Sequence, residues 1–228
     1  MQILGFHKLS LVDYPEELSS VIFTAGCNFQ CPYCHNKDIV NQVGDYINNE
    51  ELDKFLLSRQ KYISSLCISG GEPTLQKDLE HFIQKYKERG FNIKLDTNGS
   101  NPRVLKKLLD KDLLDYVAMD LKTGITHYER VIGKQGYEEH VQESVDLLKN
   151  STIDYEFRTT FVKDLMSPQS IEGLKKMIKN SRRFVLQSVK LNDEVLSPGI
   201  QMESFTKEEM EKFKEEFTPY VEEIRLNL

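Results

Sequence analysis

Residues 21–36 read VIFTAGCNFQCPYCHN, and they combine a short apolar run with three closely spaced cysteines. The run at 21–24 has the length and residue types of a buried strand, and the glycine that follows marks a turn. The same order recurs at LCISGGEPT (66–74), IKLDTNG (93–99) and YVAMDLKT (116–123). The sequence therefore predicts a series of strands whose carboxyl ends carry the unusual residues.

Amphipathic patterns separate these strands. In residues 76–89, four apolar side chains fall on one helical face: Leu79, Phe82, Ile83 and Tyr86. Gly90 ends that helix. The other predicted helices are 49–58, 102–110, 138–150, 167–179 and 206–217. Further strands are predicted at 155–162, at 184–189 and, more weakly, at 224–228, and residues 2–13 are expected to add an edge strand.

Strand and helix alternate through the chain, which predicts parallel strands with right-handed crossovers. Six such units suit an α/β fold with a partial or complete (β/α) barrel, in which the carboxyl ends of the strands share one face and build the active site. No linker rich in proline, glycine or serine appears. We therefore expect residues 1–228 to form a single domain.

The charge and hydropathy of the sequence argue against several classes of function. The 228 residues carry 36 acidic and 30 basic side chains, a formal net charge of −6, which argues against a dedicated nucleic-acid binder. No apolar run reaches the length of a membrane span. The opening MQILGFHKLSLVDYP does not resemble a signal peptide. These features predict a cytoplasmic protein without a membrane or nucleic-acid partner.

The three cysteines have the spacing Cys27-x3-Cys31-x2-Cys34. In a cytoplasmic chain such a group indicates metal binding or catalysis, not a disulfide framework. One interpretation is a zinc site with His35 or Cys67 as the fourth ligand. His35 directly follows a cysteine, which makes a shared tetrahedral ion awkward, and Cys67 lies in an apolar run typical of a core residue. The spacing favours the other interpretation, an iron–sulfur cluster with one iron left open.

The segment CNFQCPYC resembles the first motif of the radical S-adenosylmethionine (SAM) superfamily, including the aromatic Tyr33 before the last cysteine. GGEPTLQ (70–76) resembles the second motif of that superfamily. DTNG (96–99) and MDLK (119–122) are similar to glycyl-radical-enzyme activases, and LVDYPEEL (11–18) with the cysteine loop most resembles the activating proteins of anaerobic ribonucleoside-triphosphate reductase. The resemblance covers residues 5 to about 190 and implies a partial (β/α)6 TIM-like barrel.

The resemblance also implies cofactors. Cys27, Cys31 and Cys34 would hold a [4Fe–4S] cluster, and SAM would bind its open iron. Further SAM contacts are expected from the aromatic residue of the first motif and from the second motif. These residues are Tyr33, Gly70, Gly71 and Glu72. The glycines would let backbone approach the ligand closely, and Glu72 would accept a hydrogen bond from the SAM amino group.

Later motifs supply the remaining candidates. The resemblance implies SAM contacts at Asp96, Asn98, Asp120 and Lys122. Arg158 lies in the fifth apolar run, where a charge is costly unless paired, and is expected near the methionyl or ribose part of SAM. The resemblance also implies a monovalent cation at Asp96, Thr97 and Asp120, because two carboxylates that converge repel each other unless a cation or proton lies between them. Two features depart from the activases: Pro15-Glu16-Glu17-Leu18 stands where many have PGxR, and Gln187 and Ser188 stand where some have a histidine.

The function implied is reductive cleavage of SAM and transfer of the radical to a glycine of a partner enzyme, with flavodoxin or ferredoxin as the electron donor. The partner would be anaerobic ribonucleotide reductase. One alternative is a small-molecule radical SAM enzyme similar to 7-carboxy-7-deazaguanine synthase, although no motif for a pterin-like ring is seen. A third interpretation is a non-catalytic zinc-binding scaffold.

Overall fold

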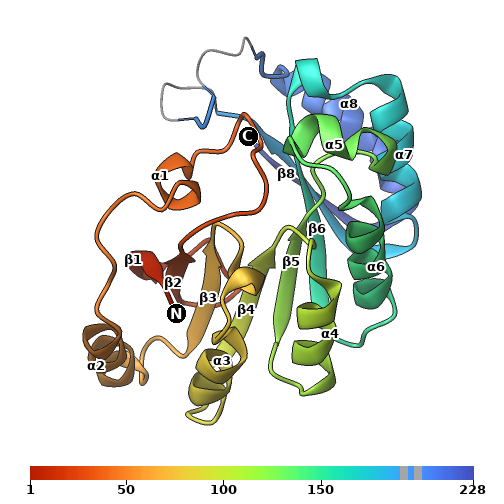
Figure 1. The fold of residues 1–228 in the computed structure, drawn as a ribbon. Coiled ribbons are helices and arrows are strands. Elements are labelled where there is room, and N and C mark those ends of the chain that lie inside the picture. The colour runs from red at the N-terminus through yellow and green to blue at the C-terminus, as the bar shows by residue number, and fades with distance from the viewer. Residues whose placement is uncertain (191–194, 198–201) are drawn as a thin grey trace. The chain divides into compact units, whose positions relative to one another are not determined.

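A computed structural model describes residues 1–190, 195–197 and 202–228 of the chain (Figure 1). Within this part of the chain, eight strands form one sheet whose order follows the sequence from β1 to β8. The chain groups into two compact units. Unit 1 consists of Met1–Asn28, Asp38–Thr97 and Arg103–Val117, and unit 2 consists of Phe29–Lys37, Asn98–Pro102 and Ala118–Leu228.

Unit 1 begins with an antiparallel pair and continues with parallel strands. Its strands are β1 (Ile3–Ser10), β2 (Ser19–Thr24), β3 (Ser65–Gly70), β4 (Asn92–Thr97) and the start of β5 (Tyr116–Asp120). Its helices are α1 (Lys37–Val40), α2 (Asn49–Arg59), α3 (Leu79–Lys87) and α4 (Pro102–Asp110). β1 is antiparallel to β2, as the predicted edge strand, whereas β2, β3 and β4 are parallel neighbours.

Unit 2 contains the end of β5 and three later strands. These are β6 (Asp154–Phe161), β7 (Ser181–Ser188) and β8 (Val221–Asn227), and β6, β7 and β8 are parallel neighbours. Its helices are α5 (Tyr128–Ile132), α6 (Glu138–Lys149), α7 (Pro168–Ile178) and α8 (Lys207–Phe217). Helices α6 and α7 lie side by side in Figure 1. The alternation of strand and helix confirms the α/β class with a mostly parallel sheet.

The apolar side chains whose spacing predicted the helices are buried against the strands of the same unit. The four apolar residues of α3 have side chains at most 8% exposed, and α3 packs on β4. In unit 2, Phe217 of α8 lies 5.2 Å from the ring of Phe184 on β7 and 6.0 Å from that of Phe161 on β6. Each unit therefore buries the apolar face of its helices against its own strands.

One helix begins later than the sequence pattern predicts. Helix α3 begins at Leu79 instead of residue 76, because a 3₁₀ turn (Pro73–Leu75) comes first. The Gln76 side chain then donates a hydrogen bond to the carbonyl oxygen of Ala25 at 2.9 Å. This contact holds Gln76 outside the helix and ties the turn after β3 to the end of β2.

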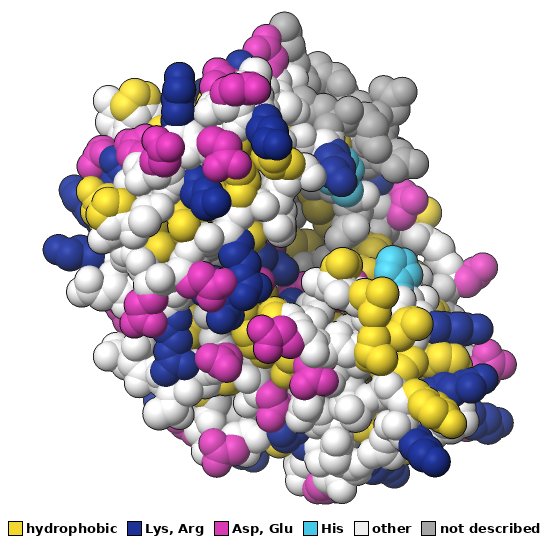
Figure 2. Space-filling view, turned by 180° about the vertical axis from the view of Figure 1, so that it is seen from behind, with side chains coloured by type: hydrophobic (Ala, Val, Ile, Leu, Met, Phe, Trp, Pro, Cys, Tyr) yellow, Lys and Arg dark blue, Asp and Glu magenta, His cyan; other side chains and the backbone are white. Residues whose placement is uncertain are grey.

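The described residues contain no helix that is both long and apolar enough to cross a membrane. Large apolar side chains are nevertheless exposed at the end of β1 and just after it: Leu9, Leu11 and Val12 are 57%, 72% and 86% exposed. Figure 2 shows hydrophobic side chains gathered beside lysine and arginine side chains on one face of the molecule.

Candidate functional site

The cysteine loop follows β2 and passes from unit 1 to unit 2. Cys27 belongs to unit 1, and Cys31 and Cys34 belong to unit 2. None of the three forms a disulfide. The backbone N–H of Cys34 donates to the carbonyl oxygen of Cys31 at 3.1 Å, so these two residues close a tight turn. Cys31 is buried, whereas Cys27 and Cys34 are partly exposed.

Backbone hydrogen bonds hold the loop within unit 2. The N–H of Gln30 donates to the carbonyl oxygen of Ile132, at the end of α5, at 2.8 Å. After β7, the N–H of Leu196 donates to the carbonyl oxygen of Cys34 at 2.8 Å, and the N–H of Ser197 donates to that of Pro32 at 3.1 Å. Segments far apart in sequence therefore fix the backbone that carries the thiols.

The chemistry of the donors fits an iron–sulfur cluster better than zinc. Three thiols on one loop provide soft thiolate ligands for three irons. In the described part of the chain, no group of three or more His, Cys, Asp or Glu side chains forms a ready metal site. Of the two candidates for a fourth zinc ligand, His35 is exposed and Cys67 is fully buried within β3, where it pairs in register with Lys94 of β4.

The two glycines of GGEP are required by the packing of unit 1. Gly70 has a φ of +115°, and a Cβ at this position would lie 2.3 Å from the backbone nitrogen of Thr24. A Cβ on Gly71 would lie 1.9 Å from the carbonyl oxygen of Gly26. The backbone that these glycines allow to approach is therefore the end of β2, just before the first cysteine.

Glu72 is fully buried and accepts several hydrogen bonds. Its Oε1 accepts from the backbone N–H and the hydroxyl of Thr74, at 3.0 and 2.6 Å, and from the hydroxyl of Thr97 at 2.8 Å. The Glu72 N–H donates to the carbonyl oxygen of Gly26 at 2.8 Å. Glu72 thus links the second motif to the DTNG motif within unit 1, and its contact with the SAM amino group stays a prediction.

The DTNG motif supplies one charged and one turn-forming side chain. In unit 1, Asp96 accepts a hydrogen bond from the Ser69 hydroxyl at 3.0 Å and forms an ion pair with Lys94. In unit 2, the Oδ1 of Asn98 accepts from the backbone N–H of Ser100 at 2.9 Å. Asn98 is 5% exposed and shapes the turn after β4. Sequence reasoning missed Lys94, which looked like an ordinary lysine in an apolar run.

Three charged side chains meet at the end of β5 in unit 2. Asp120 accepts from Nε of Arg158 at 2.8 Å and from Nζ of Lys122 at 3.1 Å. Burial alone would raise the pKa of Asp120, but the two cations outweigh it and hold this pKa well below its usual range. The pKa of Lys122 is raised, because Asp120 outweighs the opposing effect of burial. The group carries two positive charges and one negative charge.

The cysteine loop lies within electrostatic reach of this group. Burial raises the pKa of the Cys31 thiol to about 11, against the lowering effect of Lys122. Burial and the neighbouring Cys31 raise the pKa of Tyr33. Tyr33 is 6% exposed, and its hydroxyl has no hydrogen-bond partner among the described residues. Unit 2 thus brings together Cys31, Cys34 and Tyr33 of the first motif with Asp120, Lys122 and Arg158.

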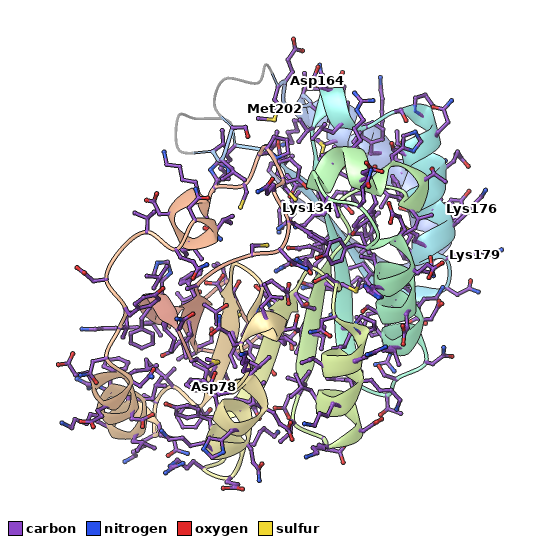
Figure 3. The ribbon with its side chains drawn as sticks, in the orientation of Figure 1. Asp78, Lys134, Asp164, Lys176, Lys179 and Met202 are labelled. Carbon is purple, nitrogen blue, oxygen red and sulfur yellow. The ribbon has the colours of Figure 1, made fainter. Side chains whose placement is uncertain are left out.

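A polar pocket of about 710 Å³ opens in unit 2 beside the segment that binds the cysteine loop. Its lining consists of Thr126, His127, Glu129, Arg130, Gly133, Lys134 and Gln135. A Cβ on Gly133 would lie 3.5 Å from the Cβ of Gln30, and Arg130 donates to the carbonyl oxygen of Asp164 at 3.3 Å. Figure 3 labels Lys134 and Asp164 in this part of unit 2. Sequence motifs gave no signal for this pocket.

The LVDYPEEL segment departs from the activases in sequence but keeps a glycine-like conformation. Glu16 has a φ of +64°, in the left-handed region that favours glycine. It occupies the place of the glycine in PGxR. Leu18, at the place of the arginine, is 46% exposed. The backbone of the turn therefore tolerates the loss of glycine at the cost of local strain.

Comparison with known proteins identifies relatives. The profile of the radical SAM superfamily matches residues 21–184. A Methanocaldococcus jannaschii protein whose name assigns it to the glycyl-radical enzyme activating enzymes is 37% identical over 199 residues, 84% of this chain and 81% of that protein. The pyruvate formate-lyase-activating enzyme of Clostridium pasteurianum is 30% identical over 191 residues, 79% of this chain and 77% of that enzyme.

Solved structures show the same fold at low sequence identity. Streptococcus suis SuiB bound to S-adenosylmethionine superimposes with a TM-score of 0.71 at 15% identity, over 90% of this chain and 49% of SuiB. QueE from Escherichia coli superimposes with a TM-score of 0.52 at 15% identity, over 82% of this chain and 83% of QueE. The chain thus spans about half the length of SuiB. These similarities support the fold alone.

Proposed function

The chain belongs to the radical SAM superfamily, and from this premise we propose that it activates a glycyl-radical enzyme. The similarity to two activating enzymes over more than three quarters of the chain supports this reaction. We propose anaerobic ribonucleoside-triphosphate reductase as the partner and flavodoxin or ferredoxin as the electron donor. The support for that partner is the resemblance of the LVDYPEEL segment and the cysteine loop.

The proposed cofactors are a [4Fe–4S] cluster and SAM. Cys27, Cys31 and Cys34 would hold the cluster, because three thiols free of disulfides match three of its irons. When bound, the cluster and SAM would supply the radical chemistry that forms a glycyl radical on the partner. The chain itself would bind the cluster and SAM, orient SAM, and exclude water and oxygen from the site. Residues 1–228 would act as one domain in the cytoplasm.

The observation that carries the proposal is the charged group beside the cysteine loop in unit 2. Two cations and one carboxylate leave a net charge of +1 at Asp120, Lys122 and Arg158, which suits the carboxylate of SAM. The side chains are 16–28% exposed, so a bound anion would be partly shielded from water. Tyr33, with its hydroxyl buried and without a partner among the described residues, would lie near the adenine.

Within unit 1, the second motif would contribute to SAM binding through Glu72, which follows β3. We assign Glu72 as acceptor for the SAM amino group and Asn98 as the residue that fixes the turn after β4. Gly70 and Gly71 support this assignment indirectly, because their packing on β2 sets the start of the cysteine loop. A monovalent cation at Asp96, Thr97 and Asp120 has weaker support, since each of the two carboxylates already has a cationic partner.

The proposal is tested by anaerobic reconstitution of the cluster. Dithionite and SAM are added, 5′-deoxyadenosine is quantified, and Cys31→Ala serves as the control. The same reaction is then run with a candidate glycyl-radical reductase, and electron paramagnetic resonance detects a glycyl radical. We expect deoxyadenosine in the first reaction and the radical in the second.

Other outcomes would point elsewhere. Deoxyadenosine without a protein radical would contradict activation of that reductase. It would favour another partner or a small-molecule substrate, as in the 7-carboxy-7-deazaguanine synthase interpretation. The similarity to QueE is one of fold and does not by itself favour that substrate. A protein that takes up zinc but neither iron nor sulfide would contradict radical chemistry altogether.

A further inference from the structure

A buried lysine lies in the middle of β4, two residues before the DTNG aspartate. Lys94 is 2% exposed. It pairs in register with Cys67 of β3, and its Nζ lies 3.8 Å from the Cys67 sulfur and 6.0 Å from the ring centre of Tyr116. A buried ammonium is costly unless a negative charge compensates it. The identity of that negative charge shows what the lysine does.

The compensating charge is Asp96. Side chains two residues apart on a strand lie on the same face, and Nζ of Lys94 forms an ion pair with Oδ1 of Asp96. The second carboxylate oxygen, Oδ2, accepts from the Ser69 hydroxyl at 3.0 Å. Asp96 is only 13% exposed, so this pair is largely shielded from water. Both carboxylate oxygens are therefore engaged within unit 1.

The same arrangement occurs in unit 2. Asp120, at the end of β5, pairs with Lys122, two residues later, and with Arg158. The resemblance to the activases assigns a monovalent cation to Asp96, Thr97 and Asp120, on the ground that two carboxylates would otherwise repel. In this chain each carboxylate has a cationic partner from its own unit. The electrostatic requirement for an added cation is thereby met by side chains.

We propose that Lys94 is the resident counter-ion of Asp96 and replaces the monovalent cation in this protein. Lys94 is then a positioning residue: it offsets the charge of Asp96 and, with the Ser69 hydroxyl, fixes the orientation of its carboxylate. The consequence for SAM rests on the proposed function. The binding of sodium at Asp96 does not, because it is measured without cluster or SAM and tests the Lys94–Asp96 pair within unit 1.

The direct test uses the metal-free chain and ²³Na relaxation. We expect no saturable broadening of the ²³Na signal by the wild-type chain, because the ammonium occupies the carboxylate. In Lys94→Met the carboxylate loses this ammonium, so saturable broadening should appear, and potassium should displace the sodium. The double variant Lys94→Met with Asp96→Asn should lose it again. Lys87→Met, which breaks the Lys87–Asp115 pair at 2.8 Å in the same unit, is the matched control and should behave as wild type.

A second measurement follows SAM cleavage by the reconstituted enzyme in potassium chloride and in tetramethylammonium chloride at equal ionic strength. The rate of SAM cleavage by wild type or by Lys94→Arg should differ by less than about twofold between the two salts. Lys94→Met should cleave SAM at least about tenfold faster in potassium chloride.

Saturable sodium binding by the wild-type chain would overturn the proposal. So would a folded Lys94→Met that shows neither sodium binding nor a preference for potassium. If Lys94→Met does not fold, the wild-type and Lys94→Arg measurements still decide. Absence of deoxyadenosine in every variant would count against the proposed function, while the ²³Na result would stand.

Discussion

At the scale of the residue, Glu16 keeps the left-handed backbone conformation of a turn in which many activases have glycine. The residue holds φ at +64°, where a Cβ is unfavourable by about 1–2 kcal/mol. Glycine relieves that strain but adds freedom to the unfolded chain, worth about 0.4–1 kcal/mol in the opposite direction. The strain is therefore the larger of the two effects.

We expect Glu16→Gly to raise the free energy of unfolding by about 0.5–1 kcal/mol. Glu16→Ala is the matched control, because alanine keeps the Cβ and should bring no comparable gain. Urea denaturation of both variants beside wild type measures the difference. Equal stability of the glycine and alanine variants would show that the turn is not strained.

At the scale of the element, one carboxylate connects α2 to α3. Asp53 of α2 accepts from the Tyr86 hydroxyl and pairs with Lys85, both on α3. Burial would raise the pKa of Asp53, but these two hydrogen bonds outweigh it and lower the pKa. Because the folded-state pKa is the lower one, this stabilisation is full above the unfolded pKa of about 3.9 and is lost as pH falls through the folded value.

Asp53→Asn should therefore reduce stability by roughly 1–2 kcal/mol at pH 7, and this difference should shrink as the pH is lowered below about 3.9. Asp110→Asn in the exposed Lys106–Asp110 pair should change stability by less than about 0.5 kcal/mol at either pH. Urea denaturation at pH 7 and near pH 3 provides the comparison. A difference that is the same at both values would contradict the role of the charge.

The segment after β7 binds the cysteine loop through two main-chain hydrogen bonds, from Leu196 and Ser197. Leu196→Pro removes the N–H that donates to Cys34, whereas Leu196→Ala keeps it. Loss of this bond, worth about 1 kcal/mol, should speed cluster loss about fivefold. Iron release to a chelator after reconstitution measures the rate, and the alanine variant should match wild type. Equal rates in both variants would mean that the segment does not stabilise the loop.

At the scale of the whole molecule, the two units share strand β5 and alternate along the chain. Unit 1 and unit 2 each consist of three segments, so the chain passes between them five times. Neither unit is a continuous stretch that could fold before the other. We therefore expect residues 1–228 to unfold in one cooperative transition.

Circular dichroism and tyrosine fluorescence in urea should give coincident curves with one midpoint. Tyr14 and Tyr116 belong to unit 1, and Tyr128 and Tyr155 to unit 2, so fluorescence reports on both units. Two separate transitions would contradict the single-domain expectation and would favour independent folding of the units.

The order of strands and helices could be predicted from the sequence because apolar periodicity survives in every main element. The start of α3 could not, since the hydrogen bond from Gln76 to Ala25 joins residues 51 apart. Lys94 escaped prediction for a related reason: a lysine between apolar residues in a strand looks solvent-exposed until its partner on the same face is known. The bonds from Leu196 and Ser197 involve backbone groups and leave no residue signature.

The contact between Gly71 and Gly26 has a consequence for how such chains diverge. A side chain at 71 would meet the carbonyl oxygen of residue 26 at 1.9 Å, so residue 71 cannot gain a side chain unless the backbone at residue 26 moves with it. Gly71 of the second motif and the backbone at Gly26, just before the cysteine motif, are thus in direct steric contact. Changes at these two places should therefore occur together in related sequences. Homologues that replace Gly71 should also carry an insertion or a displaced turn before the first cysteine, a pattern of covariation that a set of related sequences can reveal.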